Sequence, residues 1–408
     1  MAIFYSIGIF LYGLLIRAAS LFNEKASLWV RGRKEVFTYL SEKVGKSDGP
    51  IWVHCASLGE FEQGRPLIEA IRARYPEKKI LLTFFSPSGY EIRKNYQQAD
   101  YVCYLPLDTA SNARRFMDIV KPEKVFFIKY EFWYHFLTAL KKAGVPAYLV
   151  SANFREGQLF FRWYGGWYRN MLHLFRHIFV QNERSALLLT SAGYNSFSVT
   201  GDTRFDRVYS IASQAKEDAV AQAFCKGSPV FIAGSTWPAD EDILALYINQ
   251  FKGNRKFIIA PHELDRPHIS RLVSLLTCRT VCYSDCKAGV PEGVEVLIID
   301  NIGILSSLYR YGDVGYIGGG FGKGIHNILE AATFGLPVLF GPNYEKFNEA
   351  KELVTEGGAF PIRDIESVKS VLEKLLTDPE ALKTASATAS GYIRKNLGAT
   401  EKILSKTF

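Results

Sequence analysis

The sequence predicts an α/β fold built from two Rossmann-like domains, each on a parallel β-sheet. Short apolar runs alternate with charged segments of helical spacing, which is typical of βαβ units. The runs form two series, separated by a polar, helix-like passage over residues 203–226. Two parallel sheets in succession are therefore expected.

Residues 1–16 (MAIFYSIGIFLYGLLI) carry no charged side chain, and the first basic residues all follow them. This asymmetry predicts an uncleaved membrane anchor over residues 1–22, with the body of the protein on the cytoplasmic side. As a helix the sixteen residues reach about 24 Å, against a hydrocarbon core of about 30 Å. Both a short tilted span and a monotopic anchor fit that length.

The first domain is expected over residues 23–203 and the second over 204–385. The strands predicted for the first are 51–56, 79–85, 100–106, 124–130, 147–152 and 177–182. Those predicted for the second are 229–233, 256–260, 294–299, 314–317 and 337–340.

Composition narrows the classes of function. The chain has 408 residues, of which 48% are hydrophobic and 22% charged, so it can fill two or three cores and is not disordered. A formal net charge of +8 indicates an anionic partner: nucleic acid, phospholipid or an acidic substrate. The scattered cysteines fit reduced thiols, and the spacing of Cys278, Cys282 and Cys286 lacks the C-x2-C pairs of zinc sites.

Ligands of parallel sheets bind beyond the carboxyl ends of the strands, so the loops after the apolar runs should carry the site. After the first run, Gly59 permits a tight turn and Glu60 falls near the start of a helix, pointing into the expected cleft. A carboxylate at a helix start also has a purely structural explanation, since it complements the helix dipole. Small, polar and charged residues recur after the later runs.

The segment from Gly318 to Ala350 (GGGFGKGIHNILEAATFGLPVLFGPNYEKFNEA) predicts a strand, a glycine loop, a helix and a second strand. Glycines allow close approach of a ligand, and a helix beginning near Asn327 would direct N–H groups at a phosphate. The loop is not a P-loop, because Gly324 stands where Ser or Thr would hold magnesium. It also lacks the G-x-G-x-x-G spacing of nicotinamide and flavin enzymes. A glycine turn that serves packing alone is the alternative.

The anchor, the Ser57-Leu58-Gly59-Glu60 turn with residues 65–68 (RPLI), and the glycine loop with residues 347–349 (FNE) together resemble a known family. It is that of the membrane-anchored 3-deoxy-D-manno-octulosonic acid (Kdo) transferases of lipopolysaccharide biosynthesis. The resemblance is collinear over nearly the whole chain. It implies a GT-B fold of two facing Rossmann-like domains, with a last helix over residues 386–408 that crosses back to the first domain.

The resemblance further implies an inverting transfer of Kdo from CMP-Kdo to a lipid A precursor, at the cytoplasmic face of the inner membrane. Glu60 would accept the proton of the acceptor hydroxyl as the new bond forms. Glu131 is a second catalytic candidate. The family commonly has Glu-Thr-Glu-Leu-Trp-Pro where residues 128–134 read IKYEFWY, so the second Glu and the Trp are kept.

The donor would be held by residues that follow strands of the second domain. Those expected to contact CMP are Pro261, His262, Ile302, Gly303, Ile304, Gly319, Gly320, Asn327, Ile328, Leu329 and Glu330. Glu330 or Glu349, the latter beside Asn348, would accept hydrogen bonds from the ribose, and Ser235, Thr236 and Arg204 would reach the phosphate or the Kdo carboxylate. The family often has arginine at the position of His262.

The acceptor side is expected to be basic. Arg31, Arg33, Lys34 and Arg65 would attract the phosphates of the acceptor, although general attraction to anionic lipid explains each of them equally well. No metal is expected, because a leaving monophosphate needs less charge neutralisation than a diphosphate.

The sequence leaves two alternative functions open, one enzymatic and one not. One is another GT-B nucleotide-sugar transferase or a UDP-sugar epimerase, which would bind UDP in preference to CMP. The other is a non-catalytic membrane scaffold, a class that usually loses the base, whereas Glu60 is present. Transfer of one, two or more Kdo units fits the sequence.

Overall fold

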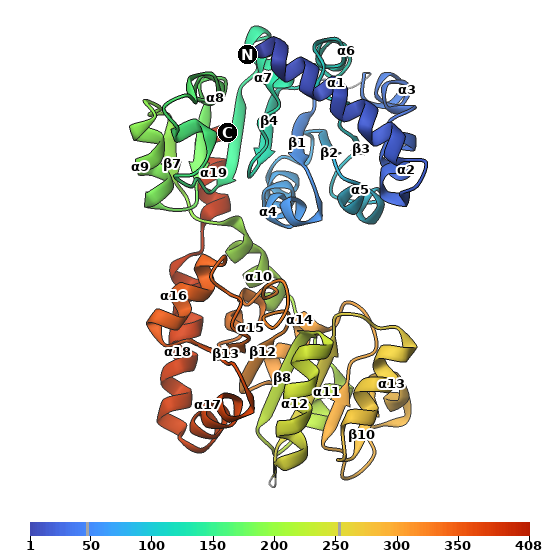
Figure 1. Cartoon of the computed structure of the whole chain (residues 1–408), viewed down its shortest axis with the longest axis vertical. Helices are drawn as coiled ribbons and strands as arrows, with labels where there is room; N and C mark the ends of the chain where they lie inside the picture. Colours follow the sequence, from blue (N-terminus) through green and yellow to red (C-terminus); the bar gives the residue numbers. More distant parts are fainter. Residues whose placement is uncertain (46–48, 252–253) are drawn as a thin grey trace. The chain divides into compact units, whose positions relative to one another are not determined.

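The computed structural model describes residues 1–45, 49–251 and 254–408. The chain divides into two compact units (Figure 1). The first unit comprises residues 1–207 together with 397–408, and the second comprises residues 208–396. Each unit is an α/β layer structure with its own parallel sheet.

The first unit holds a seven-stranded parallel sheet in the order β3-β2-β1-β4-β5-β6-β7. Its strands are β1 (Ile51–Cys55), β2 (Ile80–Phe84), β3 (Tyr101–Tyr104), β4 (Lys124–Ile128), β5 (Ala147–Ala152), β6 (His177–Val180) and β7 (Phe197–Val199). The chain moves outward from β1 to β3 and then returns to pair β4 with the other side of β1. That reversal between β1 and β4 is the topological switch point, where ligands of such sheets bind.

Helices cover both faces of this sheet. The strands are therefore buried on both sides. The helices are α2 (Glu24–Arg31), α3 (Val36–Tyr39), α4 (Leu58–Arg74), α5 (Pro87–Arg93), α6 (Ala110–Val120), α7 (Tyr134–Lys142), α8 (Gly166–Leu172), α9 (Glu183–Ser191) and α19 (Ala399–Thr407). A π-helical turn spans Leu40–Val44 and a 3-10 turn spans Leu159–Phe161. Trp52, Phe116 and Phe127 pack in the core on one face, and Phe61 and Ile68 on the other.

The last helix, α19, completes the first unit although it is last in sequence. Ile403 and Leu404 are buried in the core on the α4 face of the sheet. At the chain's end, Lys124 Nζ donates a hydrogen bond of 2.7 Å to the carbonyl oxygen of Thr407. The ring of Phe408 stacks on Tyr75 with centroids 4.4 Å apart.

The second unit repeats the architecture, with strand order β10-β11-β9-β8-β12-β13-β14, all parallel. Its strands are β8 (Val230–Thr236), β9 (Lys256–Pro261), β10 (Thr280–Cys282), β11 (Val296–Ile298), β12 (Val314–Ile317), β13 (Val338–Phe340) and β14 (Ala359–Pro361). The switch point lies between β8 and β12.

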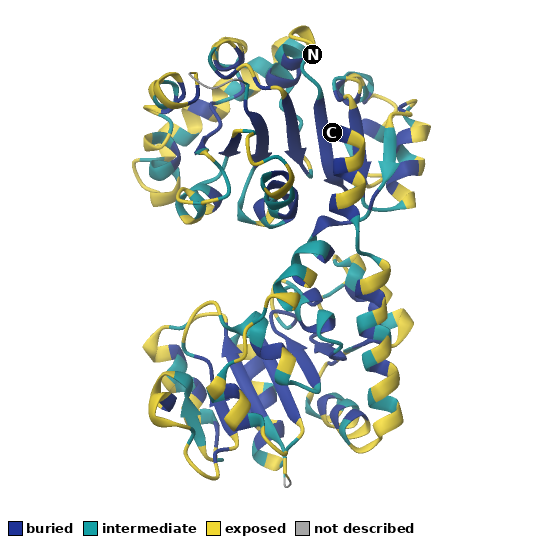
Figure 2. Ribbon diagram, turned by 180° about the vertical axis from the view of Figure 1, so that it is seen from behind, coloured by how far each residue is buried: buried dark blue, intermediate teal, exposed yellow. Residues whose placement is uncertain are grey.

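The helices of the second unit follow the same alternation. They are α11 (Ala219–Cys225), α12 (Pro238–Gln250), α13 (Arg266–Leu275), α14 (Leu305–Leu308), α15 (Leu329–Thr333), α16 (Asn348–Glu356), α17 (Ile365–Thr377) and α18 (Pro379–Lys395), with 3-10 turns at Tyr283–Ala288 and Tyr309–Tyr311. The helix α10 (Thr203–Ser213) begins in the first unit and ends in the second. In both units the strands are coloured mostly as buried and the outer faces of the helices as exposed (Figure 2).

The expected α/β fold with two parallel sheets is confirmed, and each of the eleven predicted apolar runs contains a strand. Three strands were missed: β7, β10 and β14. Each has only three residues and lies at the edge of its sheet. An edge strand is covered on fewer sides, so it lacks the continuous apolar run that marks a central strand.

The N-terminal helix α1 (Ala2–Ala19) is long and apolar enough to cross a membrane, with a mean hydropathy of 1.8. It lies across the first unit (Figure 1) and packs one side onto it. Tyr5 donates a 2.5 Å hydrogen bond to Asp108, Ser6 Oγ lies 3.0 Å from His135 Nε2, and the Tyr12 ring contacts Trp29. The opposite side is apolar and exposed: Ile3, Phe4, Ile7, Phe10, Leu11, Leu14 and Leu15.

Candidate functional site

In the first unit, both predicted catalytic carboxylates follow the two strands that flank the switch point. Glu60 lies in the first turn of α4, directly after β1, and Glu131 follows β4. Because β1 and β4 are neighbours with Ile51 opposite Lys124, both loops leave the same edge of the sheet. The topology therefore brings these two residues to the place where α/β sheets bind ligands.

Glu60 is half-buried, and its carboxylate accepts a short hydrogen bond from the hydroxyl of Ser57. Ser57 is the N-cap residue of α4, so Glu60 lies among the unpaired N–H groups at the start of that helix. The helix dipole stabilises a carboxylate there. One Glu60 oxygen is thus oriented by Ser57.

Glu131 is buried and is held by two nitrogen donors. Trp133 Nε1 donates to Glu131 Oε2 at 2.6 Å, and His54 Nε2 lies 3.2 Å from the same oxygen. The other ring nitrogen of His54 lies 2.8 Å from the hydroxyl of Thr83, which also accepts a bond from Trp52. All these groups are satisfied when Thr83 donates to His54 Nδ1 and His54 Nε2 carries the hydrogen that faces Glu131. The sequence analysis did not single out His54, although it is the one basic residue in its apolar run.

Two predicted arginines are engaged within the first unit. Arg65 Nε donates to Glu69 at 2.7 Å, one turn along α4. Arg204 Nε donates to Asp202 at 2.8 Å, and Asp202 also accepts bonds from Gln63 and Gln181. Arg204 belongs to the first unit, whereas the other donor-binding candidates lie in the second.

The three basic candidates after α1 differ in their surroundings. Arg31 and Lys34 are exposed. The Arg33 guanidinium lies over the Trp29 ring, 3.7 Å from its centroid, and donates to the carbonyl oxygens of Trp29, Phe85 and Leu105. Burial lowers the pKa of Arg33 to about 9. Its contacts are mostly with the protein interior.

In the second unit the glycine loop follows β12 at the switch point. An added Cβ at Gly318 would lie 2.2 Å from the carbonyl oxygen of Ser235, and one at Gly320 would lie 2.6 Å from the nitrogen of Gly341. Gly319 has a φ of +92°, which favours glycine. Close backbone packing thus explains Gly318 and Gly320 directly, so the packing role weighed as an alternative is present in this loop.

A buried carboxylate holds this loop in place. Asp240, in the first turn of α12, accepts a 2.8 Å bond from the Gly319 nitrogen and a 2.6 Å bond from the Tyr316 hydroxyl. Residues 240–242 have the Asp-x-Asp spacing of some metal-dependent transferases. Here, however, Asp240 is taken up by the loop and Asp242 pairs with Arg271.

Three aromatic rings stack where β8, β9 and the glycine loop end. The His262 ring stacks against Trp237 at 4.7 Å and against His326 at 4.5 Å between centroids. Trp237 Nε1 donates to His326 Nε2 at 2.9 Å, and burial, with His262 nearby, lowers the pKa of His326. His262 thus has a defined position, although it lacks the fixed charge of the arginine that is common there. Trp237 and His326 were missed by the sequence analysis.

The remaining donor-binding candidates lie on loops at this same edge of the sheet. Ile302 follows β11 and is 91% exposed, beside Gly303 with a φ of +96° and Ile304. Asn327 donates to Glu330 at 3.1 Å. The helix that was expected to begin near Asn327 is only one turn long, α15, and begins at Leu329 after Ile328, so its dipole is weak.

Asn348 and Glu349 open α16, after β13. Ser235 has a φ of +53° and is half-buried at the end of β8. Thr236 is fully buried, and its hydroxyl donates to Glu241 at 3.0 Å. That hydroxyl is therefore used inside the unit rather than presented to a ligand.

The comparisons with known proteins agree with this architecture. A family model described as 3-deoxy-D-manno-octulosonic-acid transferase (kdotransferase) matches residues 31–207. A 3-deoxy-D-manno-octulosonic acid transferase of Bordetella pertussis is 29% identical over 375 residues, 87% of this chain and 86% of that protein. The Aquifex aeolicus enzyme of the same name is 27% identical over 350 residues, 84% of this chain and 90% of that protein. The chain is thus similar to the Kdo transferase family over residues 31–207, and to named Kdo transferases over most of its length. It is accordingly a glycosyltransferase.

Solved structures place the chain in the GT-B fold. A UDP-GlcNAc 2-epimerase from Neisseria meningitidis matches with a TM-score of 0.62 at 17% identity, over 88% of this chain and 99% of that one. MurG from Acinetobacter baumannii matches with a TM-score of 0.53 at 14% identity, also over 88% of this chain and 99% of that one. At such identities the likeness concerns the fold alone.

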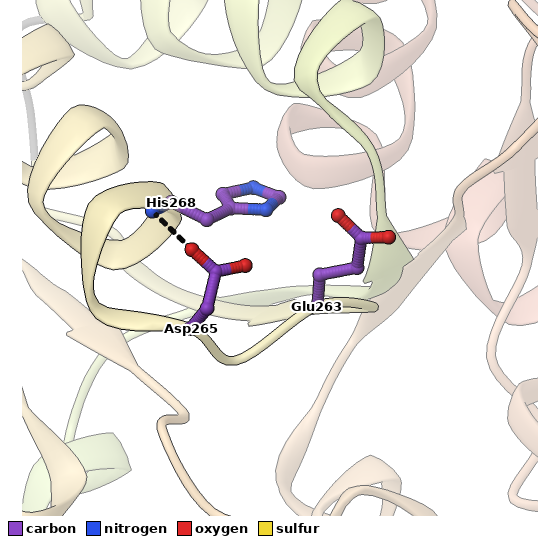
Figure 3. A group of neighbouring side chains, drawn as sticks. All are labelled: Glu263, Asp265 and His268. Atoms are coloured by element: carbon purple, nitrogen blue, oxygen red, sulfur yellow. Dashed lines mark hydrogen bonds between the residues drawn. The ribbon is translucent and has the colours of Figure 1, made fainter.

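Among the residues that the structure describes, one cluster has ligand atoms close enough for a metal ion: Glu263, Asp265 and His268, within 4.8 Å of one another (Figure 3). Asp265 caps α13 by accepting a bond from the His268 nitrogen, drawn as the dashed line. His268 Nε2 is bonded to the buried carboxylate of Glu241 at 2.8 Å. Helix capping and a buried hydrogen bond account for two of the three residues, and Glu263 is exposed.

Proposed function

We propose that the protein transfers Kdo from CMP-Kdo to a lipid A precursor with inversion, and that Glu60 is the general base. Glu60's position carries the proposal: it follows β1 at the switch point, on a helix start, with one oxygen oriented by Ser57. The family model that matches residues 31–207 is described as a Kdo transferase, which supports Kdo as the transferred sugar.

In this mechanism the acceptor hydroxyl oxygen attacks the anomeric carbon of Kdo. The bond from that carbon to the phosphate oxygen breaks, CMP leaves with the electron pair, and the hydroxyl proton passes to the Glu60 carboxylate. As CMP leaves, negative charge develops on its single phosphate group, and backbone N–H groups and histidine can stabilise that charge. We therefore propose a reaction without a metal cofactor.

Glu131 is proposed as a second carboxylate of the same site. Its two donors, Trp133 and His54, hold its carboxylate in a fixed direction. A fixed negative charge next to the reacting carbon would stabilise the positive charge that an oxocarbenium-like transition state develops.

We also propose that the protein is a monotopic protein of the cytoplasmic face of the inner membrane. The polar contacts of Tyr5 and Ser6 lie near the start of α1, while Tyr12 packs near its middle. A helix that crossed the bilayer would carry Asp108 and His135 to hydrocarbon depth, at a high desolvation cost. A helix lying in the interface buries only its exposed apolar side.

The test is Kdo transfer from freshly generated CMP-Kdo to a lipid A precursor in detergent micelles, with products resolved by mass. Glu60→Gln should lower kcat by about 10²- to 10⁴-fold, the usual contribution of a general base, while CMP binding persists. Mass also counts the Kdo units added. Glu62→Gln, two residues along α4, is the matched control.

Two outcomes would contradict the proposal. Glu60→Gln with near wild-type kcat would remove Glu60 as the base. Wild type that transfers no Kdo and binds UDP more tightly than CMP would favour the epimerase or another nucleotide-sugar transferase, which share the fold.

A further inference from the structure

The first unit contains a basic pocket of about 370 Å³ beside α1, bounded by α1, the segment from α2 to α3 and the loop after β3. We call it the α1 pocket. Arg17, Arg33 and Lys34 line it, together with apolar residues that include Val30 and Leu107. Among the described residues, none of those that line it is acidic. Three cations thus converge on a partly apolar cavity.

The charge of Arg33 has no counter-ion among the described residues. Its guanidinium donates hydrogen bonds to three backbone carbonyl oxygens, and aromatic rings flank it. Burying a charge without an opposite charge is costly, and burial accordingly lowers the pKa of this group. An anion in the pocket would offset that cost.

Arg17 and Lys34 are exposed residues that line the same pocket, and neither forms an ion pair in the part of the chain that the structure describes. Arg17 lies in the last turn of α1, one turn after Gly13, which also lines the pocket. Phe10 and Leu14, one turn before Gly13 and Arg17 respectively, are 60% and 44% exposed. Apolar surface therefore leads to the cationic end of α1.

We propose that the α1 pocket binds the phosphate group of an anionic glycerophospholipid of the bilayer. Arg17 and Lys34 contact the phosphate oxygens, Arg33 supplies charge from the pocket wall, and the acyl chains lie along the exposed side of α1. This lipid is distinct from the sugar acceptor.

A continuous layer of aromatic rings lies between the pocket and Glu131. It consists of Trp29, Phe85 and Trp133, with successive ring centroids 5.7 Å and 4.7 Å apart. Trp133 in turn donates a hydrogen bond to Glu131. The rings thus separate the pocket from that carboxylate.

The test measures binding of short-chain lipids to the full-length protein in detergent by titration calorimetry. Dihexanoyl phosphatidylglycerol should bind, and dihexanoyl phosphatidylcholine and inorganic phosphate should bind at least tenfold more weakly. The double variant Arg17→Gln with Lys34→Gln should bind phosphatidylglycerol at least tenfold more weakly, because each cation near an anionic lipid adds to the binding free energy. The control Arg114→Gln with Lys142→Gln removes two exposed charges outside the pocket and should change affinity less than twofold.

A second variant separates the pocket from general electrostatic attraction. Val30→Trp keeps every charge but fills the cavity, so it should also abolish binding, with thermal unfolding used to verify the fold. Retained binding in Val30→Trp, or equal loss in the control pair, would overturn the proposal. So would inorganic phosphate binding as tightly as the lipid, or displacement of phosphatidylglycerol by the lipid A precursor, which would make the pocket an acceptor subsite.

Discussion

Glu131 shows how a single carboxylate is fixed by residues that sequence spacing does not connect. Its partner His54 lies on β1, and His54 is oriented by Thr83 on the neighbouring strand β2. Only the pairing of β1 with β2 and with β4 brings these side chains together. A carboxylate with two N–H donors on one oxygen is held in one direction, which suits a role in stabilising charge.

Trp133→Phe should impair catalysis more than folding. The change removes the 2.6 Å bond to Glu131 and keeps an aromatic ring, so Glu131 loses one donor of about 1.5–3 kcal/mol. We expect kcat to fall about tenfold or more, with KM for the donor little changed. Steady-state kinetics measure this.

The control for this change is Trp163→Phe, a tryptophan that is 90% exposed. It should leave kcat unchanged. If Trp133→Phe lowers only the unfolding midpoint and not kcat in folded protein, the orientation of Glu131 does not matter to the reaction.

His177 couples the stability of the first unit to pH. Its Nε2 lies 2.9 Å from the Ser198 hydroxyl, which accepts a 2.7 Å bond from Lys406 of α19. Burial, followed by the charges of Lys406 and Arg176, lowers the pKa of His177 to about 4. The neutral imidazole is therefore the form that this arrangement accepts.

The sign of the pH dependence follows from this shift. An unfolded histidine has a pKa near 6.5, so the folded state binds fewer protons at His177 between about pH 6.5 and 4. Stability from this group is present above pH 6.5 and is lost as the pH falls toward 4. His177→Gln should flatten that part of the profile of unfolding free energy against pH. An unchanged slope in the variant would show that His177 does not titrate in this range.

The turn of Glu60 could be predicted from the sequence, whereas the surroundings of Arg33 could not. Gly59, Glu60 and the apolar spacing behind them are local signals. Arg33 looks like one of several surface cations after an anchor. Its guanidinium is bound by the carbonyl oxygens of Phe85 and Leu105, which lie more than fifty residues away in the sequence. These contacts exist only in the folded chain.

At the scale of elements, the glycine loop after β12 is built on backbone contacts. Gly318 lies against the backbone of Ser235 and Thr236, and the Gly319 nitrogen is fixed by Asp240. The loop's position is thereby tied to the end of β8. Residues of both segments are donor-binding candidates, so a shift of one should move the other.

Gly318→Ala should weaken CMP binding. The new Cβ would lie 2.2 Å from a backbone oxygen that no rotamer can move away, at a strain of about 1–3 kcal/mol. Gly322→Ala is the matched control, because its nearest neighbour would be 3.6 Å away. We expect CMP affinity to fall about tenfold in the first variant and less than twofold in the second, measured by calorimetry. Equal affinities would mean that donor binding does not depend on this loop.

The central strands and the loops after them were predictable because burial on both faces leaves continuous apolar runs, as in β1 and β4. The late start of α15 was not, because Ile328 shares the helical apolar spacing of Leu329 and Ala332 although the helix begins only at Leu329. The glycines correctly predicted where the loop after β12 lies, but they did not show why glycine is needed there. Close packing of backbone against backbone leaves the same sequence pattern as close approach to a ligand.

At the scale of the whole molecule, α1 decides how the protein meets the membrane. One side of it is tied to the first unit by Tyr5, Ser6 and Tyr12, and the other is apolar and exposed. This division of a uniformly apolar helix into two sides could not be read from the sequence. It favours a helix lying along the interface of one leaflet.

Spin labels at Phe4 and Leu15, both on the exposed side, should report this orientation. The two positions are eleven residues apart, about 16 Å along the helix. In vesicles we expect their depths, measured by power saturation, to agree within a few ångströms. A difference near 16 Å would mean that α1 crosses the bilayer. A label on exposed Lys142 of α7 gives the aqueous reference.

The return of residues 397–408 to the first unit has a consequence for the order in which the protein forms. Ile403 and Leu404 fill the core beside α4, and Thr407 accepts the bond from Lys124. On a ribosome, residues 1–207 therefore emerge with an open side to their hydrophobic core, which stays open while all of 208–396 is synthesised. A domain that is first in sequence usually folds first. Here the second unit can finish before the first, because the core beside α4 is completed only when α19 has been synthesised.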